Sequence, residues 1–296
     1  MTQFRPALLR PLLLLWLMFL KRPMATKITF VNHCDHMVWP TIITDEGCPS
    51  LQTTGFELNP NFSRSFYLPT GWRGRIWART GCSFNGSRRG TCVTGECRSR
   101  AIECDAARVA SPATEAGLVL GVGAFGEDDS YYVGVSHGFN LPMILAAING
   151  TGKCPAAGCA VDLNPLCPPK LRVAGGKACK SPCQEFRNPE KCCTGEYHSR
   201  AACKPSTHLE GFRQACPRLY SYPYDTTSIL RCSNANYTVS FCPFVASKKF
   251  TKKSSYRPKA RPESGAMGGS GYKTMVLQKK IGVSGSTSPH APHRHR

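Results

Sequence analysis

The sequence predicts a mainly β protein: a β-sandwich with a disulfide-rich annex of loops and short helices at about residues 154–216. Short runs of alternating or β-branched residues, broken by turn residues, recur along the chain and are typical of half-buried strands. Long helical periodicity is absent. Nine of the 17 cysteines fall in the annex.

Five segments carry the strand pattern, namely residues 27–31, 65–68, 75–78, 131–133 and 237–241. Their period-two alternation predicts strands with one buried and one solvated face. Pro-Thr-Gly at 69–71 and Asn-Gly at 85–86 and 149–150 supply turns between such segments.

Two short helices are expected within the annex. Thr207 with Glu210 three residues later forms a capping box at the start of the first. The second is expected to begin at Ser181-Pro182, with Gln184 in its first turn.

Both ends differ from the middle of the chain. Residues 1–24 contain four basic residues, no acid and a run of nine apolar residues at 12–20. That run is shorter than the roughly 20 residues of a membrane-spanning helix and fits a secretory signal. We therefore expect a cleaved signal, a secreted protein of the apoplast or cell wall, and no stable membrane span in the mature chain.

Most of the formal charge of +20 lies outside the central region. Residues 247–296 hold twelve Lys and Arg against one acid, Glu263, a composition that predicts a basic, disordered tail. Residues 25–246, the predicted folded domain, carry only +5. The overall charge is therefore weak support for a nucleic-acid partner, and none is expected.

Cysteine usage indicates an oxidising compartment, since all 17 cysteines lie between residues 34 and 242. The number is odd, so one thiol is left without a partner. Cys179 and Cys183, with the adjacent pair at 192–193, have some features of a zinc site, but a paired Cys-x-x-Cys framework is missing. We expect no metal and no cofactor.

Four segments make the chain similar to a known family. They are Ile28-Thr29-Phe30-Val31-Asn32-His33-Cys34, the run from Gly71 to Cys82, Gly138-Phe139-Asn140-Leu141-Pro142-Met143, and Phe241-Cys242-Pro243. Over about residues 25–244 the chain resembles the thaumatin-like proteins, the pathogenesis-related group five of plant defence proteins. The resemblance implies a thaumatin-like β-sandwich.

Sixteen cysteines fall at the spacing of that family, and Cys48 is the extra one. The resemblance implies the pairs Cys34–Cys242, Cys82–Cys92, Cys97–Cys104, Cys154–Cys232, Cys159–Cys216, Cys167–Cys179, Cys183–Cys192 and Cys193–Cys203. Cys48 is expected to be unpaired and is a candidate intermolecular thiol in an otherwise monomeric protein. One family motif is altered, because Arg88 and Glu96 replace Gly and Asp, and Arg98-Ser99-Arg100 replaces a Gly-rich stretch.

Family members that act on fungi have an acidic cleft of one Arg and four acids. In this chain Arg75 matches the Arg, but Gly117 stands at the Glu position, and Tyr132 and His137 stand at the two central Asp positions. Glycoside hydrolysis needs two carboxyl groups facing each other across the substrate. No such pair is evident, so a non-enzymatic protein is expected.

The last acidic position aligns with Thr226, although Asp225 lies beside it. The alignment over 112–132 is loose, and a shift of one or two residues brings in Glu115, Asp128 or Asp129. Asp128, Asp129 and Asp225 remain ligand candidates, together with His137.

The strand at 72–79 offers a second type of ligand contact. Period two places Arg73, Arg75, Trp77 and Arg79 on one face, where an aromatic ring among guanidinium groups stacks on sugars or binds anions. The alternative is a buried Trp with solvated Arg edges. The complete set of ligand candidates is Arg75, Trp77, Arg79, Asp128, Asp129, Tyr132, His137 and Asp225.

Four sequons begin at Asn61, Asn85, Asn149 and Asn236 and are candidate N-glycosylation sites. The resemblance and the lost acids together suggest a secreted antifungal defence protein. It would bind cell-wall or fungal-surface polysaccharide of the β-1,3-glucan class without cleaving it. The alternatives are a weak endo-β-1,3-glucanase and an inhibitor of a secreted microbial glycosidase.

Overall fold

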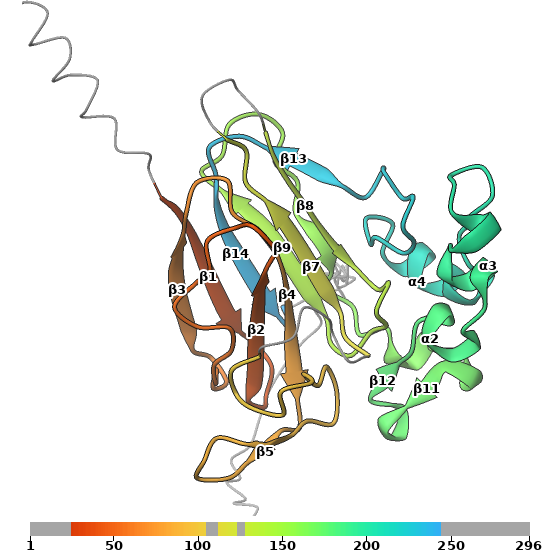
Figure 1. Ribbon diagram of the computed structural model, residues 1–296, viewed down its shortest axis with the longest axis horizontal. Coiled ribbons are helices and arrows are strands. Elements are labelled where there is room, and N and C mark those ends of the chain that lie inside the picture. The colour runs from red at the N-terminus through yellow and green to blue at the C-terminus, as the bar shows by residue number, and fades with distance from the viewer. Residues whose placement is uncertain (1–24, 105–111, 123–127, 244–296) are drawn as a thin grey trace, which may run out of the picture. The chain divides into compact units, whose positions relative to one another are not determined.

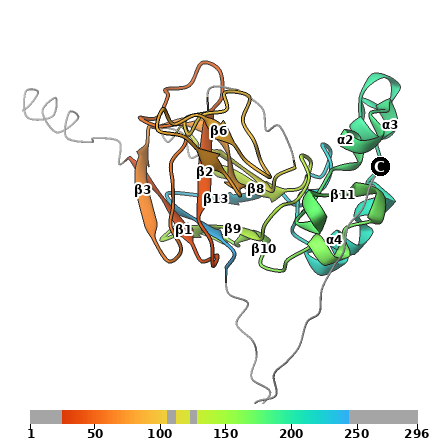
Figure 2. The ribbon, with the colours of Figure 1, turned by 90° about the horizontal axis from the view of Figure 1, so that it is seen from below.

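The computed structural model describes residues 25–104, 112–122 and 128–243 (Figure 1). The predicted signal segment and the predicted basic tail lie outside these residues and stay predictions. Within the described part, two five-stranded sheets form the body of the protein, and an annex of short helices and small strands lies to one side of them (Figures 1 and 2).

The first sheet has the strand order β10-β9-β14-β1-β3. Its strands are β1 (Thr26–Asn32), β3 (Ser63–Leu68), β9 (Met143–Ile148), β10 (Ala157–Cys159) and β14 (Asn236–Phe241). Strands β1 and β14 pair in parallel, which brings the two ends of the domain side by side. The Cys34–Cys242 disulfide joins the chain just beyond these two strands.

The second sheet has the order β13-β8-β7-β4-β2, with antiparallel pairing throughout. Its strands are β2 (Val38–Thr44), β4 (Arg73–Thr80), β7 (Glu115–Val119), β8 (Asp129–Gly134) and β13 (Leu230–Cys232). The segments predicted as strands at 27–31, 65–68, 75–78, 131–133 and 237–241 all lie within strands of the two sheets.

The main core lies between the sheets, because alternate residues of each strand point inward. In β14 the residues Tyr237, Val239 and Phe241 are buried, whereas the residues between them are partly exposed. Tyr131 of the second sheet packs edge-on against Tyr237 of the first, with ring centroids 5.5 Å apart. Burial of this apolar surface is the main stabilising contribution to the sandwich.

A second, smaller apolar cluster covers part of the outer face of the second sheet. It consists of Ile43, Trp77, Cys97, Cys104 and Ala113. The segment at 82–104 supplies two of its members and carries strands β5 (Ser83–Phe84) and β6 (Gly90–Thr91). Disulfides Cys82–Cys92 and Cys97–Cys104 hold this segment. The outer face is therefore covered at one end by the 82–104 segment.

The annex is built from small elements linked by disulfides. They are η2 (Asn164–Leu166), η3 (Pro169–Leu171), β11 (Arg172–Val173), η4 (Ala174–Gly176), β12 (Ala178–Cys179), α2 (Pro182–Phe186), α3 (Pro189–Cys192), η5 (Gly195–Tyr197), η6 (Thr207–Leu209) and α4 (Glu210–Ala215). Phe139 connects it to the sandwich by a bridge to Cys179 and an edge-on ring contact with Phe212 at 5.9 Å.

Both predicted annex helices are present. Helix α2 has the expected capping box, in which Ser181 accepts from the Gln184 amide and Gln184 from the Ser181 amide. The predicted box of Thr207 with Glu210 is wrong. The helical segment starts one residue earlier, and Ser206 caps it by accepting from the His208 amide.

All eight disulfides join the pairs implied by the resemblance. Among the described cysteines Cys48 is the free one, and it is half-buried. Within the same residues no helix combines the length and apolar character needed to cross a membrane.

Candidate functional site

Strand register brings two of the candidate residues together on the outer face of the second sheet. Arg75 of β4 lies opposite Gly117 of β7, which lies opposite Tyr132 of β8. Directly opposed residues of antiparallel strands share a face, so these three form one row across the sheet. Glu115 and Gly134 belong to the next row. The name outer-sheet surface is used below for Arg75, Glu115, Tyr132, His137 and Tyr220.

Tyr132 covers the position where the resemblance places an acid. A Cβ atom at Gly117 would stand 2.2 Å from Cε1 of Tyr132, so the phenol ring occupies that space. The ring also packs against Tyr220, with centroids 4.6 Å apart. Burial, reinforced by the charge of Glu115, raises the pKa of Tyr132 well above its usual value, and Arg75 only partly opposes this. The phenol is therefore a neutral donor at physiological pH.

Glu115 is the buried carboxylate of this surface, with a side chain that is 5% exposed. The Tyr132 hydroxyl donates to its Oε1 over 3.4 Å, and Nδ1 of His137 lies 3.4 Å from its Oε2. The latter contact lacks hydrogen-bond geometry, and no other described residue satisfies that oxygen or that nitrogen. A buried polar pair of this kind has unused hydrogen-bonding capacity.

Neighbouring elements contact His137 at one end of the outer-sheet surface and Arg75 at the other. The His137 carbonyl accepts hydrogen bonds from the Ala113 amide at 2.9 Å and from Nε2 of Gln184 in α2 at 3.3 Å. At the other end, Nε of Arg75 lies 3.9 Å from Oδ1 of Asp45. The annex therefore borders the surface at His137, and the loop after β2 borders it at Arg75.

Asp225 lies near this surface, but its carboxylate is hydrogen-bonded within its own loop. Its carboxylate accepts from Thr227 Oγ1 at 2.8 Å, the Ser228 amide at 3.2 Å and Ser228 Oγ at 2.9 Å. Burial raises the pKa of Tyr220 to about 12, and the charges of Asp225 and Glu115 contribute to that rise. Tyr220 is thus close to both acids, while the oxygens of Asp225 are committed to the loop.

A family model described as "Thaumatin family" matches residues 32–243. The chain belongs to the thaumatin family. Among its relatives is "Thaumatin-like protein 1" of Arabidopsis thaliana, 48% identical over 73% of this chain and 85% of the relative. Another is "Pathogenesis-related thaumatin-like protein 3.5" of Cryptomeria japonica, 42% identical over 74% of this chain and 90% of the relative.

One relative of this thaumatin-family chain is named as an enzyme. "Glucan endo-1,3-beta-glucosidase" of Prunus avium is 40% identical over 74% of this chain and 91% of the relative. Among solved structures, the thaumatin-like xylanase inhibitor TLXI is 23% identical, covers 73% of this chain and 99% of its own, and superposes with a TM-score of 0.42.

Asp129 and Asp128 are two further predicted ligand contacts of this thaumatin-family chain. Asp129 is buried, with Oδ1 accepting from the Gly121 amide at 2.9 Å and Oδ2 from the Tyr237 hydroxyl at 2.7 Å. It faces the core because it is three residues from Tyr132, on the opposite side of β8. Asp128 is exposed and accepts a hydrogen bond from Ser233. The prediction of Asp129 as a ligand contact is therefore wrong, whereas that of Asp128 stays a prediction.

Trp77 and Arg79 were predicted to lie on an exposed strand face, but both side chains are buried. Trp77 is 1% exposed and donates to the Gly95 carbonyl at 2.9 Å, beneath the 82–104 segment. Arg79 is fully buried and donates to the carbonyls of Ala101, at 2.7 Å, and Ile102. Burial lowers the pKa of Arg79 to about 10. Neither side chain offers a surface for a sugar.

Sequence analysis reached Glu115 only through a shift of the alignment. The alternation of side chains along a strand could have identified it, because Glu115 lies two residues before Gly117 on β7 and therefore on the same face. Among the described residues no group of three or more His, Cys, Asp and Glu is placed to hold a metal ion.

The sequon asparagines at 61, 85 and 149 are exposed, whereas Asn236 is half-buried and accepts from the Lys27 amide at 2.8 Å. Their glycosylation stays a prediction.

Proposed function

We propose that the chain is a secreted plant defence protein that binds cell-wall or fungal-surface polysaccharide of the β-1,3-glucan class without hydrolysing it. The supporting observation is that the ring of Tyr132 occupies the space above Gly117, the position at which the family resemblance places a carboxyl group. Membership of the thaumatin family and relatives named as pathogenesis-related proteins support the defence role.

The chemistry of the outer-sheet surface favours binding over cleavage. Hydrolysis requires one carboxyl group as acid and a second as nucleophile or base, about 5–10 Å apart. Glu115 supplies one carboxylate, but Asp129 points into the core and the oxygens of Asp225 bind Thr227 and Ser228. Neither of these two acids is therefore a free partner for Glu115.

Sugar binding suits the groups that remain. The tilted, contacting rings of Tyr132 and Tyr220 are aromatic surface, and the Arg75 guanidinium is a donor in the same row as Tyr132. Aromatic surface next to a charged donor is a combination that suits a polyhydroxylated ring.

Eight disulfides and the signal-like N-terminal segment support secretion, because such cross-links form and persist in oxidising compartments. Expression of the full chain in plant cells, followed by intact-mass analysis of the protein in the medium, tests this part. Retention inside the cells with residues 1–24 still attached would contradict it.

Co-sedimentation with insoluble β-1,3-glucan tests the binding function. Replacing Tyr132 by Ala is expected to weaken retention about three- to tenfold, the value of one aromatic contact. Tyr67→Ala is the matched control, since Tyr67 is an exposed tyrosine on β3 of the other sheet. No retention of the unaltered protein, or equal losses in both variants, would overturn the proposal.

A weak glucanase is the second candidate, favoured by the unused buried oxygen of Glu115 beside His137 and by the name of the Prunus avium relative. Incubation with laminarin separates the two functions. Release of reducing ends that is lost in Glu115→Gln would establish the enzyme. Retention on glucan without release supports binding alone.

A further inference from the structure

A separate cavity of about 670 Å³ lies between the segment at 52–57, strand β3 and the 82–104 segment. Its volume falls in the range of roughly 300–1,000 Å³ that small-molecule sites occupy. It shares no residue with the outer-sheet surface. The groups that line it and are used below are Gln52, Glu57, Arg64, Phe84, Asn85 and Arg88.

Arg88 lines this cavity, and three more arginines lie on the same 82–104 segment. Arg88, Arg89, Arg98 and Arg100 are all exposed and lie on two adjacent segments. Backbone hydrogen bonds join those segments, from the Gly90 amide to the Arg100 carbonyl at 2.9 Å and from the Ile102 amide to the Arg88 carbonyl at 3.1 Å. The disulfides Cys82–Cys92 and Cys97–Cys104 hold the same segments. The four arginines therefore lie on a segment whose backbone is held by two disulfides and by hydrogen bonds.

Two of these arginines occupy backbone positions that favour glycine. Arg88 has φ 60° and Arg100 has φ 50°, in the left-handed region. A non-glycine residue there carries a conformational cost, and such costs gather at functional sites. Arginine at these two positions therefore carries a backbone cost that glycine would not carry.

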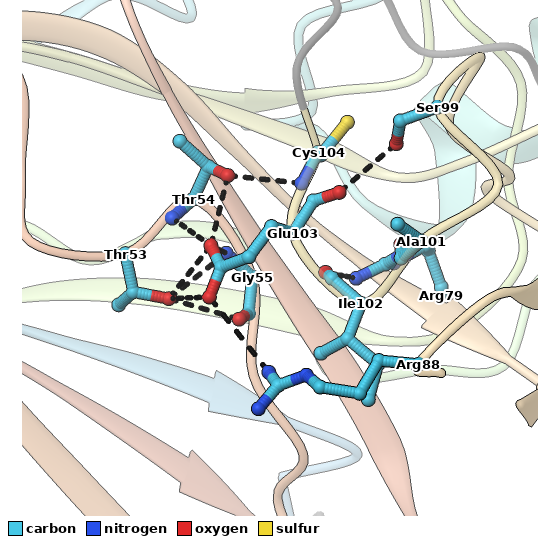
Figure 3. Close-up of polar contacts among 10 residues, drawn as sticks. All are labelled: Thr53, Thr54, Gly55, Arg79, Arg88, Ser99, Ala101, Ile102, Glu103 and Cys104. Carbon is cyan, nitrogen blue, oxygen red and sulfur yellow. Dashed lines mark hydrogen bonds and ion pairs between the residues drawn. The ribbon is translucent and has the colours of Figure 1, made fainter. Parts of the chain in front are cut away.

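The neighbouring acids are held by internal contacts, as Figure 3 shows for Glu103. Its carboxylate accepts from the amides of Thr54, at 2.7 Å, and Gly55, at 3.1 Å, and from the Thr53 hydroxyl at 2.9 Å. Nη2 of Arg88 lies 3.9 Å from its Oε1, which orients the arginine along the cavity wall.

Glu96 accepts from the amides of Cys92 and Cys97, so its carboxylate is likewise occupied by the backbone.

Arg64 faces the same cavity from strand β3. Its guanidinium lies over the rings of Phe56 and Phe66, at 4.8 and 5.0 Å from their centroids. Contact with two rings restrains the guanidinium, whose N–H groups are donors for a ligand. The cavity therefore combines oriented arginines with the half-buried ring of Phe84.

We propose that this arginine-lined cavity is a second binding site, which takes an oligosaccharide of uronic acids. The planar fork of Arg88 or Arg64 matches a sugar carboxylate with two parallel hydrogen bonds. Phe84 offers a face for the sugar ring, and Gln52, Asn85 and Glu57 offer partners for its hydroxyl groups. Arg89, Arg98 and Arg100 supply further cations for the next residues of an anionic chain.

Calorimetric titration of the full chain with a decamer of α-1,4-linked galacturonate tests the site. Loss of a charge-assisted bidentate contact weakens binding about tenfold, so Arg88→Gly with Arg100→Gly is expected to weaken it by that factor or more. Because both positions favour glycine, the variant is expected to melt no lower than the unaltered protein. The titration uses protein whose intact mass shows no glycan, since Asn85 lines the cavity and begins a sequon.

The matched control removes two arginines from the annex, with Arg187→Gly and Arg200→Gly. Both are exposed, and Arg187 also has a positive φ, 50°. The control is expected to bind within twofold of the unaltered protein, with the basic tail present in every sample. Equal weakening in both double variants, or no weakening in the first, would overturn the proposal. So would equal affinity, with the same dependence on Arg88 and Arg100, for a single-stranded oligonucleotide of equal charge.

Retention on neutral β-1,3-glucan tests whether this cavity is separate from the proposed glucan-binding surface. Loss of galacturonate binding with unchanged retention on β-1,3-glucan is the expected result for Arg88→Gly with Arg100→Gly. If that variant also lost glucan retention, the two sites would not be separate, and the second-site proposal would be wrong.

Discussion

At the scale of single residues, Glu103 shows how one carboxylate organises two distant segments. It joins Thr53, Thr54 and Gly55 to the end of the 82–104 segment, about fifty positions away in sequence (Figure 3). Burial alone would raise its pKa, but the hydrogen bonds from Thr54, Thr53 and Gly55 outweigh burial and lower the pKa. The charged form is therefore the one that the fold stabilises.

Glu103→Gln is expected to lower the free energy of unfolding by about 1 kcal/mol at pH 7, because the amide cannot accept every bond that the carboxylate accepts. The carboxylate pKa is lower in the folded than in the unfolded chain, so this stability is present at neutral pH. It is lost as the pH falls below about 4.5, the ordinary value for Glu. Urea unfolding at pH 7 and pH 3 measures the effect.

The matched variant is Glu57→Gln, an exposed acid on the neighbouring stretch of the same cavity. It should change the free energy of unfolding by less than about 0.5 kcal/mol at either pH, as surface substitutions usually do. A Glu103→Gln loss that persisted unchanged at pH 3 would show that the carboxylate charge is not responsible.

At the scale of elements, strands β7 and β8 pack closely where Gly117 of one faces Tyr132 of the other. The register places them opposite one another, and the tyrosine ring fills the space beside the glycine. The missing side chain at Gly117 and the large ring at Tyr132 are therefore two parts of one packing arrangement.

Gly117→Ala is expected to destabilise the protein by about 1–3 kcal/mol, the usual cost of overpacking, because its Cβ would lie 2.2 Å from Cε1 of Tyr132. In a Tyr132→Ala background the same change should cost almost nothing. Denaturant unfolding of the two single variants and the double variant gives the coupling between them. Additive effects would contradict the proposed packing of the ring over the glycine.

At the scale of the whole molecule, the disulfides restrict the unfolded chain to very different extents. Cys34–Cys242 joins positions 208 residues apart, whereas Cys183–Cys192 joins positions 9 apart within the annex. Chain-entropy arguments make the longer loop the larger contribution to stability.

Replacing Cys34 and Cys242 together by Ser is expected to lower the free energy of unfolding by about 5 kcal/mol. The Cys183 and Cys192 pair of changes should lower it by about 2.5 kcal/mol. Equilibrium unfolding in urea, with the other seven bridges intact, compares them directly. Equal losses would show that loop length does not set the contribution of these two bridges.

Much of the fold was predictable because its signals are local or depend on spacing. Alternating runs placed the strands, and Ser181 followed by Pro182 and Gln184 placed α2. The sixteen family-spaced cysteines implied every disulfide and left Cys48 free. The capping box at Thr207 failed because Ser206, one residue earlier, offered an equivalent hydroxyl.

The sequence by itself determined the fold class and, through the family spacing of its cysteines, the disulfide pairs. Only the tertiary structure decided which candidate side chains reach solvent. Period two places Trp77 and Arg79 on the same face as Arg75, but the 82–104 segment covers that end of the sheet. Exposure depends on which distant segment packs on a face, and alternation along one strand holds no information about that.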